Sequence, residues 1–213
     1  MRQSAVTFKT EGLNFEGVVA TPNGDGAPFP GVIICHPHPL FGGNMDNNVV
    51  LAVSFALVER GFATFRFNFR GVGNSEGEHT KGEKEHEEVL GAQDFLKAWK
   101  EVDSSAIGLA GYSFGTVVIL KNAAVQKQPR AFAFISPPLH GLENSTLKKD
   151  KRPKLIVSGD RDKLVQSDKL RSVLEPFAAK PELEIVEGAD HFWGGREDRL
   201  ITEISRFFAE NLK

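Results

Sequence analysis

Hydrophobic and polar residues alternate with two different periods along this chain. In the first twenty residues, AVTFKT and LNFEGVVA alternate residue by residue around Glu11-Gly12, which predicts an antiparallel hairpin. Further on, short β-rich runs are separated by longer segments with helical periodicity. The expected strands are 31–35, 63–69, 106–110, 131–136, 154–159 and 183–188, and the expected helices are 49–59, 83–100, 114–126, 169–177 and 199–212.

Regular alternation of strands and helices indicates an α/β fold. We expect a mostly parallel sheet with the N-terminal antiparallel hairpin added to it and helices on both faces. The chain has 213 residues, 40% of them hydrophobic, and it shows no repeat or low-complexity linker. These features predict a single domain that spans residues 1–213.

The charge balance narrows the class of partner. A formal net charge of -2 gives no basic field, so we do not expect nucleic acid or an anionic membrane as partner. A small ligand is expected instead. Lys9, Glu11 and Glu16 interrupt the apolar residues near the N-terminus, which predicts a cytoplasmic protein without a signal peptide. The single cysteine, Cys35, ends an apolar run and is expected to be a buried small residue.

The pentapeptide Gly-Tyr-Ser-Phe-Gly at residues 111–115 matches the pattern G-x-S-x-G between an expected strand and an expected helix. A serine on so sharp a turn has a strained backbone, and the strand and helix approach too closely for a Cβ atom at either glycine. Ser113 would also lie at a helix N-terminus, where free N–H groups favour developing negative charge. The motif therefore predicts a nucleophilic serine.

A serine nucleophile needs a base, and the base needs a group that orients it. Ligands of such sheets bind beyond the carboxyl ends of the parallel strands, so the residues that follow each strand matter most. Asp160 and Asp162 follow the expected strand 154–159, and His191 follows the last strand. Serine, acid and histidine thus occur in that order at the expected edge of the sheet.

Five ordered segments, HPHPLFGG, FNFRGVGNSEG, GYSFG, GDRDKLV and GADHFW, resemble the α/β-hydrolase superfamily over nearly the whole chain. The resemblance is to its small lidless branch, which includes dienelactone-hydrolase-like proteins and carboxylesterases. It implies a catalytic triad of Ser113, His191 and Asp162, with Asp160 as the alternative acid. It also implies an oxyanion hole formed by the N–H groups of Phe114 and His38.

Pro39 has no N–H to offer, so Leu40 is the next candidate for the second donor of the oxyanion hole. In the superfamily, a cap domain usually enters where this chain has only the seventeen residues 137–153, enough for a loop or short helix. We therefore expect an open cleft with a shallow apolar acyl site that favours short-chain esters. Its expected lining residues are Leu40, Phe41, Leu139, Leu164 and Trp193.

His36 and His38 suggest a metal pair, but their loop offers no third histidine or Asp-His ligand set, so neither metal nor cofactor is expected. The acidic run 83–88 is expected to be the solvated start of a helix. Three further histidines are expected to face solvent: His79, His86 and His140.

The sequence thus predicts a serine hydrolase that cleaves small acyl esters through an acyl-enzyme intermediate. The same triad would also suit a lactone, a thioester or a small-peptide amide. Dienelactone hydrolases proper use cysteine, so the serine counts against that substrate. A non-catalytic binding module that keeps the fold is the alternative from another class, and the oligomeric state is open.

Overall fold

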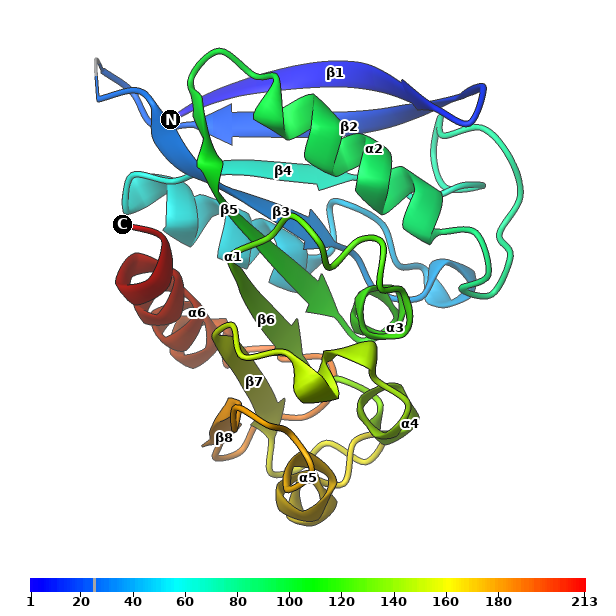
Figure 1. Ribbon diagram of the computed structural model, residues 1–213, viewed down its shortest axis with the longest axis vertical. Coiled ribbons are helices and arrows are strands. Elements are labelled where there is room, and N and C mark those ends of the chain that lie inside the picture. Colours follow the sequence, from blue (N-terminus) through cyan, green and yellow to red (C-terminus); the bar gives the residue numbers. More distant parts are fainter. Residues whose placement is uncertain (25) are drawn as a thin grey trace.

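The computed structural model describes residues 1–24 and 26–213, and its strands form an eight-stranded sheet (Figure 1). The strand order is β1-β2-β4-β3-β5-β6-β7-β8. The pairs β1–β2 and β2–β4 are antiparallel, and all other neighbours are parallel, which confirms the predicted fold class. The strands are β1 Arg2–Thr10, β2 Leu13–Thr21, β3 Phe29–Cys35, β4 Ala63–Phe67, β5 Val102–Tyr112, β6 Ala131–Ile135, β7 Lys154–Gly159 and β8 Glu182–Val186.

The helices cover both faces of this sheet (Figure 1). α1 and α6 pack on one face, and α2, α3 and α5 pack on the other, because alternate side chains of each strand point to opposite faces. In β3, for example, Ile33 contributes to one core and Ile34 to the other. The helices are α1 Asn48–Glu59, α2 His86–Lys97, α3 Phe114–Lys121, α4 Leu139–Glu143, α5 Ser167–Leu174 and α6 Glu197–Leu212.

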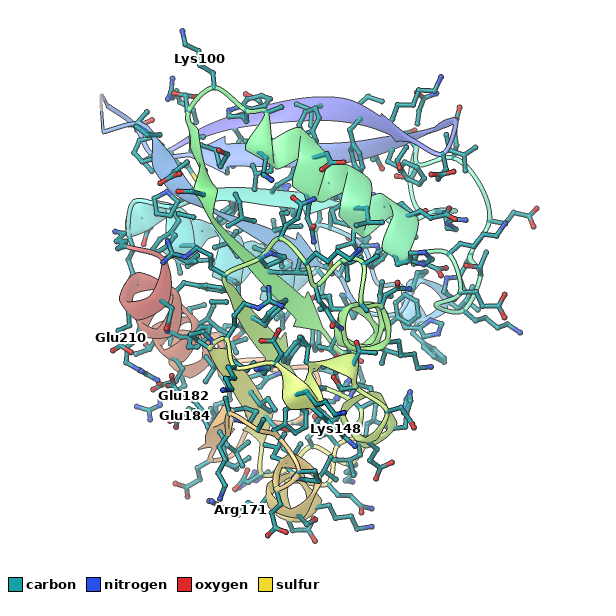
Figure 2. All side chains as sticks on the ribbon, in the orientation of Figure 1. Lys100, Lys148, Arg171, Glu182, Glu184 and Glu210 are labelled. Carbon is teal, nitrogen blue, oxygen red and sulfur yellow. The ribbon has the colours of Figure 1, made fainter. Side chains whose placement is uncertain are left out.

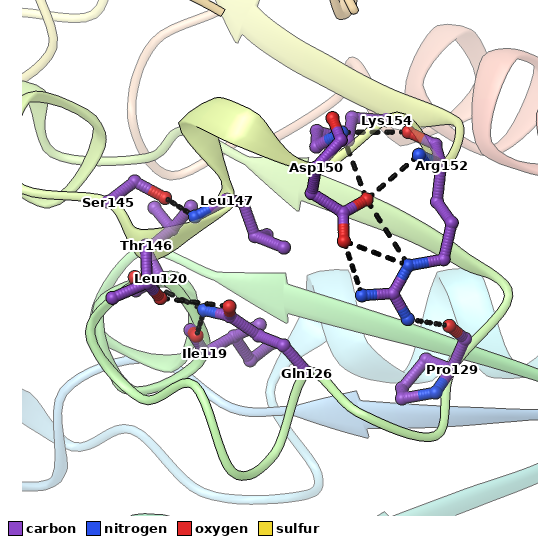
Figure 3. A network of polar contacts seen from close by, with 10 residues as sticks. All are labelled: Ile119, Leu120, Gln126, Pro129, Ser145, Thr146, Leu147, Asp150, Arg152 and Lys154. Carbon is purple, nitrogen blue, oxygen red and sulfur yellow. Dashed lines mark hydrogen bonds and ion pairs between the residues drawn. The ribbon is translucent and has the colours of Figure 1, made fainter. Parts of the chain in front are cut away.

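Helix α3 ends five residues before the predicted end at residue 126, and the side chain of Gln126 explains the difference. Its Nε2 donates to the carbonyl oxygens of Ile119 (2.7 Å) and Leu120 (3.3 Å) (Figure 3). Among the described residues, the only backbone donor to these carbonyls at the end of α3 is the N–H of Asn122, which lies 3.4 Å from the Ile119 oxygen, so the glutamine caps the helix from outside. Thr146 in turn donates to Gln126 Oε1 at 2.8 Å.

Residues 137–153 hold no more than α4 and a short 3₁₀ helix, Thr146–Lys149, as expected for a segment of this length. Hydrogen bonds and ion pairs stabilise the segment where it joins β7. Arg152 Nη2 donates to Asp150 Oδ2 at 2.6 Å, and Lys154 Nζ donates to the carbonyl oxygen of Asp150 at 2.7 Å (Figure 3). No cap domain is inserted between β6 and β7, so the carboxyl edge of the sheet stays open.

The acidic run 83–88, which extends into α2, departs from the prediction, because two of its members are buried. Glu85 accepts hydrogen bonds from the backbone N–H groups of Thr80 (2.6 Å) and Gly82 (2.8 Å). Glu88 accepts from Arg70 Nε at 2.5 Å. Both carboxylates therefore anchor the loop before the helix instead of facing water.

Strand β8 forms one edge of the sheet and has only five residues. Glu182 and Glu184 alternate along it with apolar side chains, and both project at the periphery of the molecule (Figure 2). Arg206 of α6 donates to Glu182 at 2.8 Å. Among the described helices, none combines the length and the apolar character needed to cross a bilayer.

Candidate active site

Ser113 lies between β5 and α3 in a backbone conformation that is rare for a residue with a side chain. Its φ is 50° and its ψ is -110°. A Cβ on Gly111 would lie 2.8 Å from the backbone of Gly115, and one on Gly115 would overlap the carbonyl oxygen of Cys35 at the end of β3. The two glycines thus allow β5, α3 and β3 to converge beneath the serine, as the motif predicts.

Ser113, His191 and Asp162 form a continuous hydrogen-bonded chain. Ser113 Oγ lies 2.9 Å from His191 Nε2, and His191 Nδ1 lies 2.8 Å from Asp162 Oδ2. The side chain of Asp162 is fully buried and that of His191 nearly so, whereas Ser113 is partly accessible. This arrangement holds the imidazole between an acceptor on one side and a hydroxyl on the other.

The second carboxylate oxygen of Asp162, Oδ1, accepts hydrogen bonds from the backbone. Oδ1 accepts the N–H groups of Leu164 (2.9 Å) and Val165 (2.8 Å). Burial alone would raise the pKa of Asp162, but the hydrogen bonds from His191 and from these backbone groups outweigh it and lower the pKa. Asp160 points elsewhere, because its Oδ1 accepts the N–H of Gly188 at 2.7 Å.

The loop that carries His191 is held by its neighbours. The hydroxyl of Tyr112, the residue before the serine, donates to the carbonyl oxygen of His191 at 2.6 Å. Asp190 Oδ1 accepts the N–H groups of Phe192 and Trp193 at 2.9 and 3.1 Å. The histidine therefore sits on a rigid turn, and its ring needs little ordering before it contacts the serine.

Trp193 does not line the acyl site expected for it. Its side chain is fully buried in the core beside α1 and α6, and its Nε1 donates to Ser136 Oγ at 3.1 Å. A φ of 64° turns the backbone at this residue, so the indole points inward although the sequence places it two residues from His191. Its role is to anchor the histidine loop to the end of β6.

An open pocket of about 450 Å³ lies over Ser113 and His191. Of the residues expected to line it, Phe41 and Leu164 do so, whereas Leu40 and Leu139 lie outside the lining. Leu40 is exposed to solvent, and Leu139 packs at the edge of the core. His38, expected at the oxyanion hole, also lines the pocket. The lining residues that the sequence did not single out are Pro37, Gly43, Asn47, Tyr112 and Phe192.

The backbone N–H groups expected to form the oxyanion hole are free. Within the described residues, neither the N–H of Phe114 nor that of His38 donates to an acceptor of the chain. The alternative donor, the N–H of Leu40, is already used, because it donates to His38 Nδ1 at 3.2 Å. Two N–H groups near Ser113 are thus available for an anionic oxygen.

The two histidines of the sequence HPHP have different environments. His36 is buried, with Nδ1 2.6 Å from the carbonyl oxygen of Pro37, while Nε2 accepts the N–H of Phe69 at 3.0 Å. Burial lowers its pKa to about 4, so the ring is neutral and joins the ends of β3 and β4. With both nitrogens engaged, His36 has no lone pair left for a metal ion.

His38 lies at the pocket wall in a cluster of rings. Its centroid is 5.0 Å from that of Phe41, 5.0 Å from that of His79 and 4.9 Å from that of Phe114. The side chain of His79, which was expected to face solvent, is only 8% exposed and lies 2.9 Å from a carboxylate oxygen of Glu85. The loop that carries His38 is therefore packed against the segment before α2.

Comparison with known protein families identifies the chain. A family model described as an alpha/beta hydrolase domain matches residues 32–205. An uncharacterized protein of Rickettsia prowazekii is 32% identical over 200 residues, which is 90% of this chain and 83% of the relative.

Solved structures agree with this assignment. An alpha-beta serine hydrolase homologue from Coxiella burnetii is 32% identical, with a TM-score of 0.84 and 97% of each chain covered. A serine hydrolase without a lid from Xanthomonas campestris is 29% identical, with a TM-score of 0.87 over 99% of this chain and 95% of the other. The chain therefore belongs to the alpha/beta hydrolase domain family.

Proposed function

We propose that this protein is a carboxylesterase that cleaves small acyl esters with Ser113 as nucleophile, His191 as base and Asp162 as orienting acid. The observation that carries the proposal is the hydrogen-bonded chain from Ser113 Oγ through His191 to Asp162, with distances of 2.9 and 2.8 Å. Such a chain activates a hydroxyl that is otherwise a poor nucleophile at neutral pH.

In the first half of the reaction, Ser113 Oγ attacks the ester carbonyl carbon while its proton passes to His191 Nε2. Asp162 stabilises the imidazolium and keeps its Nδ1 proton in place. The carbonyl oxygen becomes an oxyanion that accepts the free N–H groups of Phe114 and His38. Collapse of this intermediate breaks the ester C–O bond, and the imidazolium returns its proton to the departing alcohol.

In the second half, water replaces the alcohol. His191 Nε2 takes a proton from the water as it attacks the acyl carbon, and the same N–H groups hold the second oxyanion. When this intermediate collapses, Ser113 regains its proton and the carboxylic acid leaves. Every group in this cycle belongs to the chain, and the open pocket admits water directly.

Pocket size and surroundings favour short acyl groups. The volume of about 450 Å³ suits a small ligand, and the apolar side chains at its mouth, Phe41, Leu164 and Phe192, are exposed. In the part of the chain that the structure describes, no cap covers them to enclose a long alkyl chain. We expect kcat/KM to be highest for acetate to hexanoate esters and to fall toward palmitate.

Hydrolysis of a p-nitrophenyl ester series by the wild type and by Ser113→Ala, with and without a metal chelator, tests the proposal. We expect a loss of at least about 10³-fold in kcat for the variant and no effect of chelator on the wild type. Equal, slow rates for both proteins would contradict the proposal and favour a binding module. Preference for long chains would contradict the shallow pocket, and faster turnover of thioesters or lactones would redirect the substrate class.

A further inference from the structure

The pocket lining contains two polar side chains that the proposed reaction does not use. They are the imidazole of His38 and the amide of Asn47, both of which line the pocket. Each has one end fixed by a backbone N–H group. A backbone N–H can only donate, so the fixed end of each side chain accepts a hydrogen bond. This shows whether the free end of that side chain is a donor or an acceptor.

For His38, the fixed end is Nδ1, which accepts the N–H of Leu40 at 3.2 Å. An imidazole nitrogen that accepts a hydrogen bond carries no proton, so in the neutral ring the proton lies on Nε2. Burial and the neighbouring His79 lower the pKa of His38, against an opposing effect of Glu85, which favours this neutral form. His38 therefore offers an N–H donor at its outer end.

For Asn47, the fixed end is Oδ1, which accepts the N–H of Val49 at 3.0 Å and caps helix α1. This contact orients the amide and leaves the two hydrogens of Nδ2 at its free end. The amide thus adds a second donor to the pocket lining.

Both donors are free and accessible. Within the described residues, neither His38 Nε2 nor Asn47 Nδ2 donates to an acceptor of the chain. The buried polar atoms that lack a partner belong to other side chains, such as Gln93 and Ser158, so the two donors reach solvent or the pocket. The lining described for the pocket contains no aspartate, glutamate, lysine or arginine.

We propose that His38 Nε2–H and Asn47 Nδ2–H form a donor pair that binds a second, uncharged oxygen of the substrate, beyond the carbonyl that is cleaved. The inference rests on the proposed esterase function and narrows its substrate class to esters with an additional ether, hydroxyl or carbonyl oxygen. An uncharged acceptor fits because the pair is neutral and the carboxylate of Asp162 behind His191 disfavours anions.

Matched ester pairs test the donor pair. For the acyl side, p-nitrophenyl methoxyacetate is compared with p-nitrophenyl butanoate, and for the alcohol side, 2-methoxyethyl acetate is compared with butyl acetate. Within each pair, an oxygen replaces a methylene group at nearly constant size. The measured quantity is the ratio of kcat/KM for the two esters, and comparing this ratio between protein variants cancels the intrinsic reactivity of each ester.

Two variants remove one donor each and keep the local turn. Asn47→Ser retains an oxygen that caps α1, and His38→Asn retains an acceptor for the N–H of Leu40 but ends short of the Nε2 position. We expect either change to lower the oxygen-to-methylene ratio about 3- to 10-fold for at least one ester pair. Leu40→Ala, which changes an exposed side chain outside the pocket lining and keeps the N–H that donates to His38, should leave the ratio as it is.

An unchanged ratio for both ester pairs in the variants that fold would overturn the donor pair while the esterase function stands. A wild type that hydrolyses none of the esters faster than Ser113→Ala would instead refute the proposed function and, with it, this inference. Thermal unfolding shows whether each variant is folded, and because the donors lie on separate side chains, one folded variant suffices for the test.

Discussion

Replacing Asp162 by asparagine isolates the orienting function of its carboxylate. In the wild type, the N–H groups of Leu164 and Val165 lie 2.9 and 2.8 Å from Asp162 Oδ1. The asparagine keeps an oxygen that can accept both of them. Its NH₂ group then faces His191 Nδ1, where the carboxylate oxygen lies at 2.8 Å. Nδ1 must accept, so the ring proton moves to Nε2, and the histidine can no longer take the proton of Ser113.

The expected loss follows from this change of tautomer. The same substitution in a Ser-His-Asp protease costs about 10⁴-fold in kcat, which corresponds to roughly 5.4 kcal/mol of transition-state stabilisation. We therefore expect Asp162→Asn to lower kcat on a p-nitrophenyl butanoate substrate by about 10³- to 10⁴-fold, with KM nearly unchanged because the side chain does not line the pocket.

Asp160→Asn is the matched control. It makes the same chemical change two residues away, where the side chain accepts the N–H of Gly188 and where an amide oxygen does so equally well. Its kcat should stay within about twofold of the wild type. The reasoning is refuted if Asp162→Asn retains more than a tenth of the activity while folded, or if both variants lose activity equally.

Two further predictions concern the scaffold under the site. Gly115→Ala would force a Cβ into the carbonyl oxygen of Cys35, so we expect thermal or urea unfolding to show a loss of about 3 kcal/mol or more, against less than about 0.5 kcal/mol for Gly194→Ala, where a Cβ meets nothing within 4 Å. Comparable losses would contradict the close approach. The pKa of His36 falls from 6.5 to about 4 on folding, so its contribution is present above pH 6.5 and is lost as the pH falls toward and below 4. Between pH 7 and pH 3.5, the unfolding free energy of the wild type should fall by about 3 kcal/mol more than that of His36→Gln. If the unfolding free energies of the two proteins ran parallel with pH, the neutral His36 ring would not contribute to stability.

The strands and the order of the site residues could be predicted because their signals are local. Alternation marks the N-terminal hairpin and short β-rich runs mark the later strands, and the positions just after β5 and β7 and in the loop after β8 hold Ser113, Asp162 and His191. The choice between Asp160 and Asp162 needed the resemblance to a family, since both follow the same strand. The structure separates them by contacts, one to the imidazole and one to the backbone.

The errors have a common physical cause, which is the direction in which a side chain points. Trp193 lies near His191 in the sequence, but a positive φ turns its indole into the core. Glu85 and Glu88 belong to an acidic run, yet they are buried because a loop and Arg70 supply their donors. Asn47 caps α1, and nothing in the sequence indicates that its free end lies at the pocket.

The edge strand β8 has a consequence for how the protein behaves at high concentration. An exposed strand edge is a template on which a second chain can add a strand and begin to aggregate, and natural sheets counter this with short strands and charged residues. β8 combines both, with five residues and the carboxylates of Glu182 and Glu184. Self-pairing along β8 would bring like charges together and separate Glu182 from Arg206. The short, charged edge strand β8 thus disfavours aggregation by strand pairing between copies of the protein.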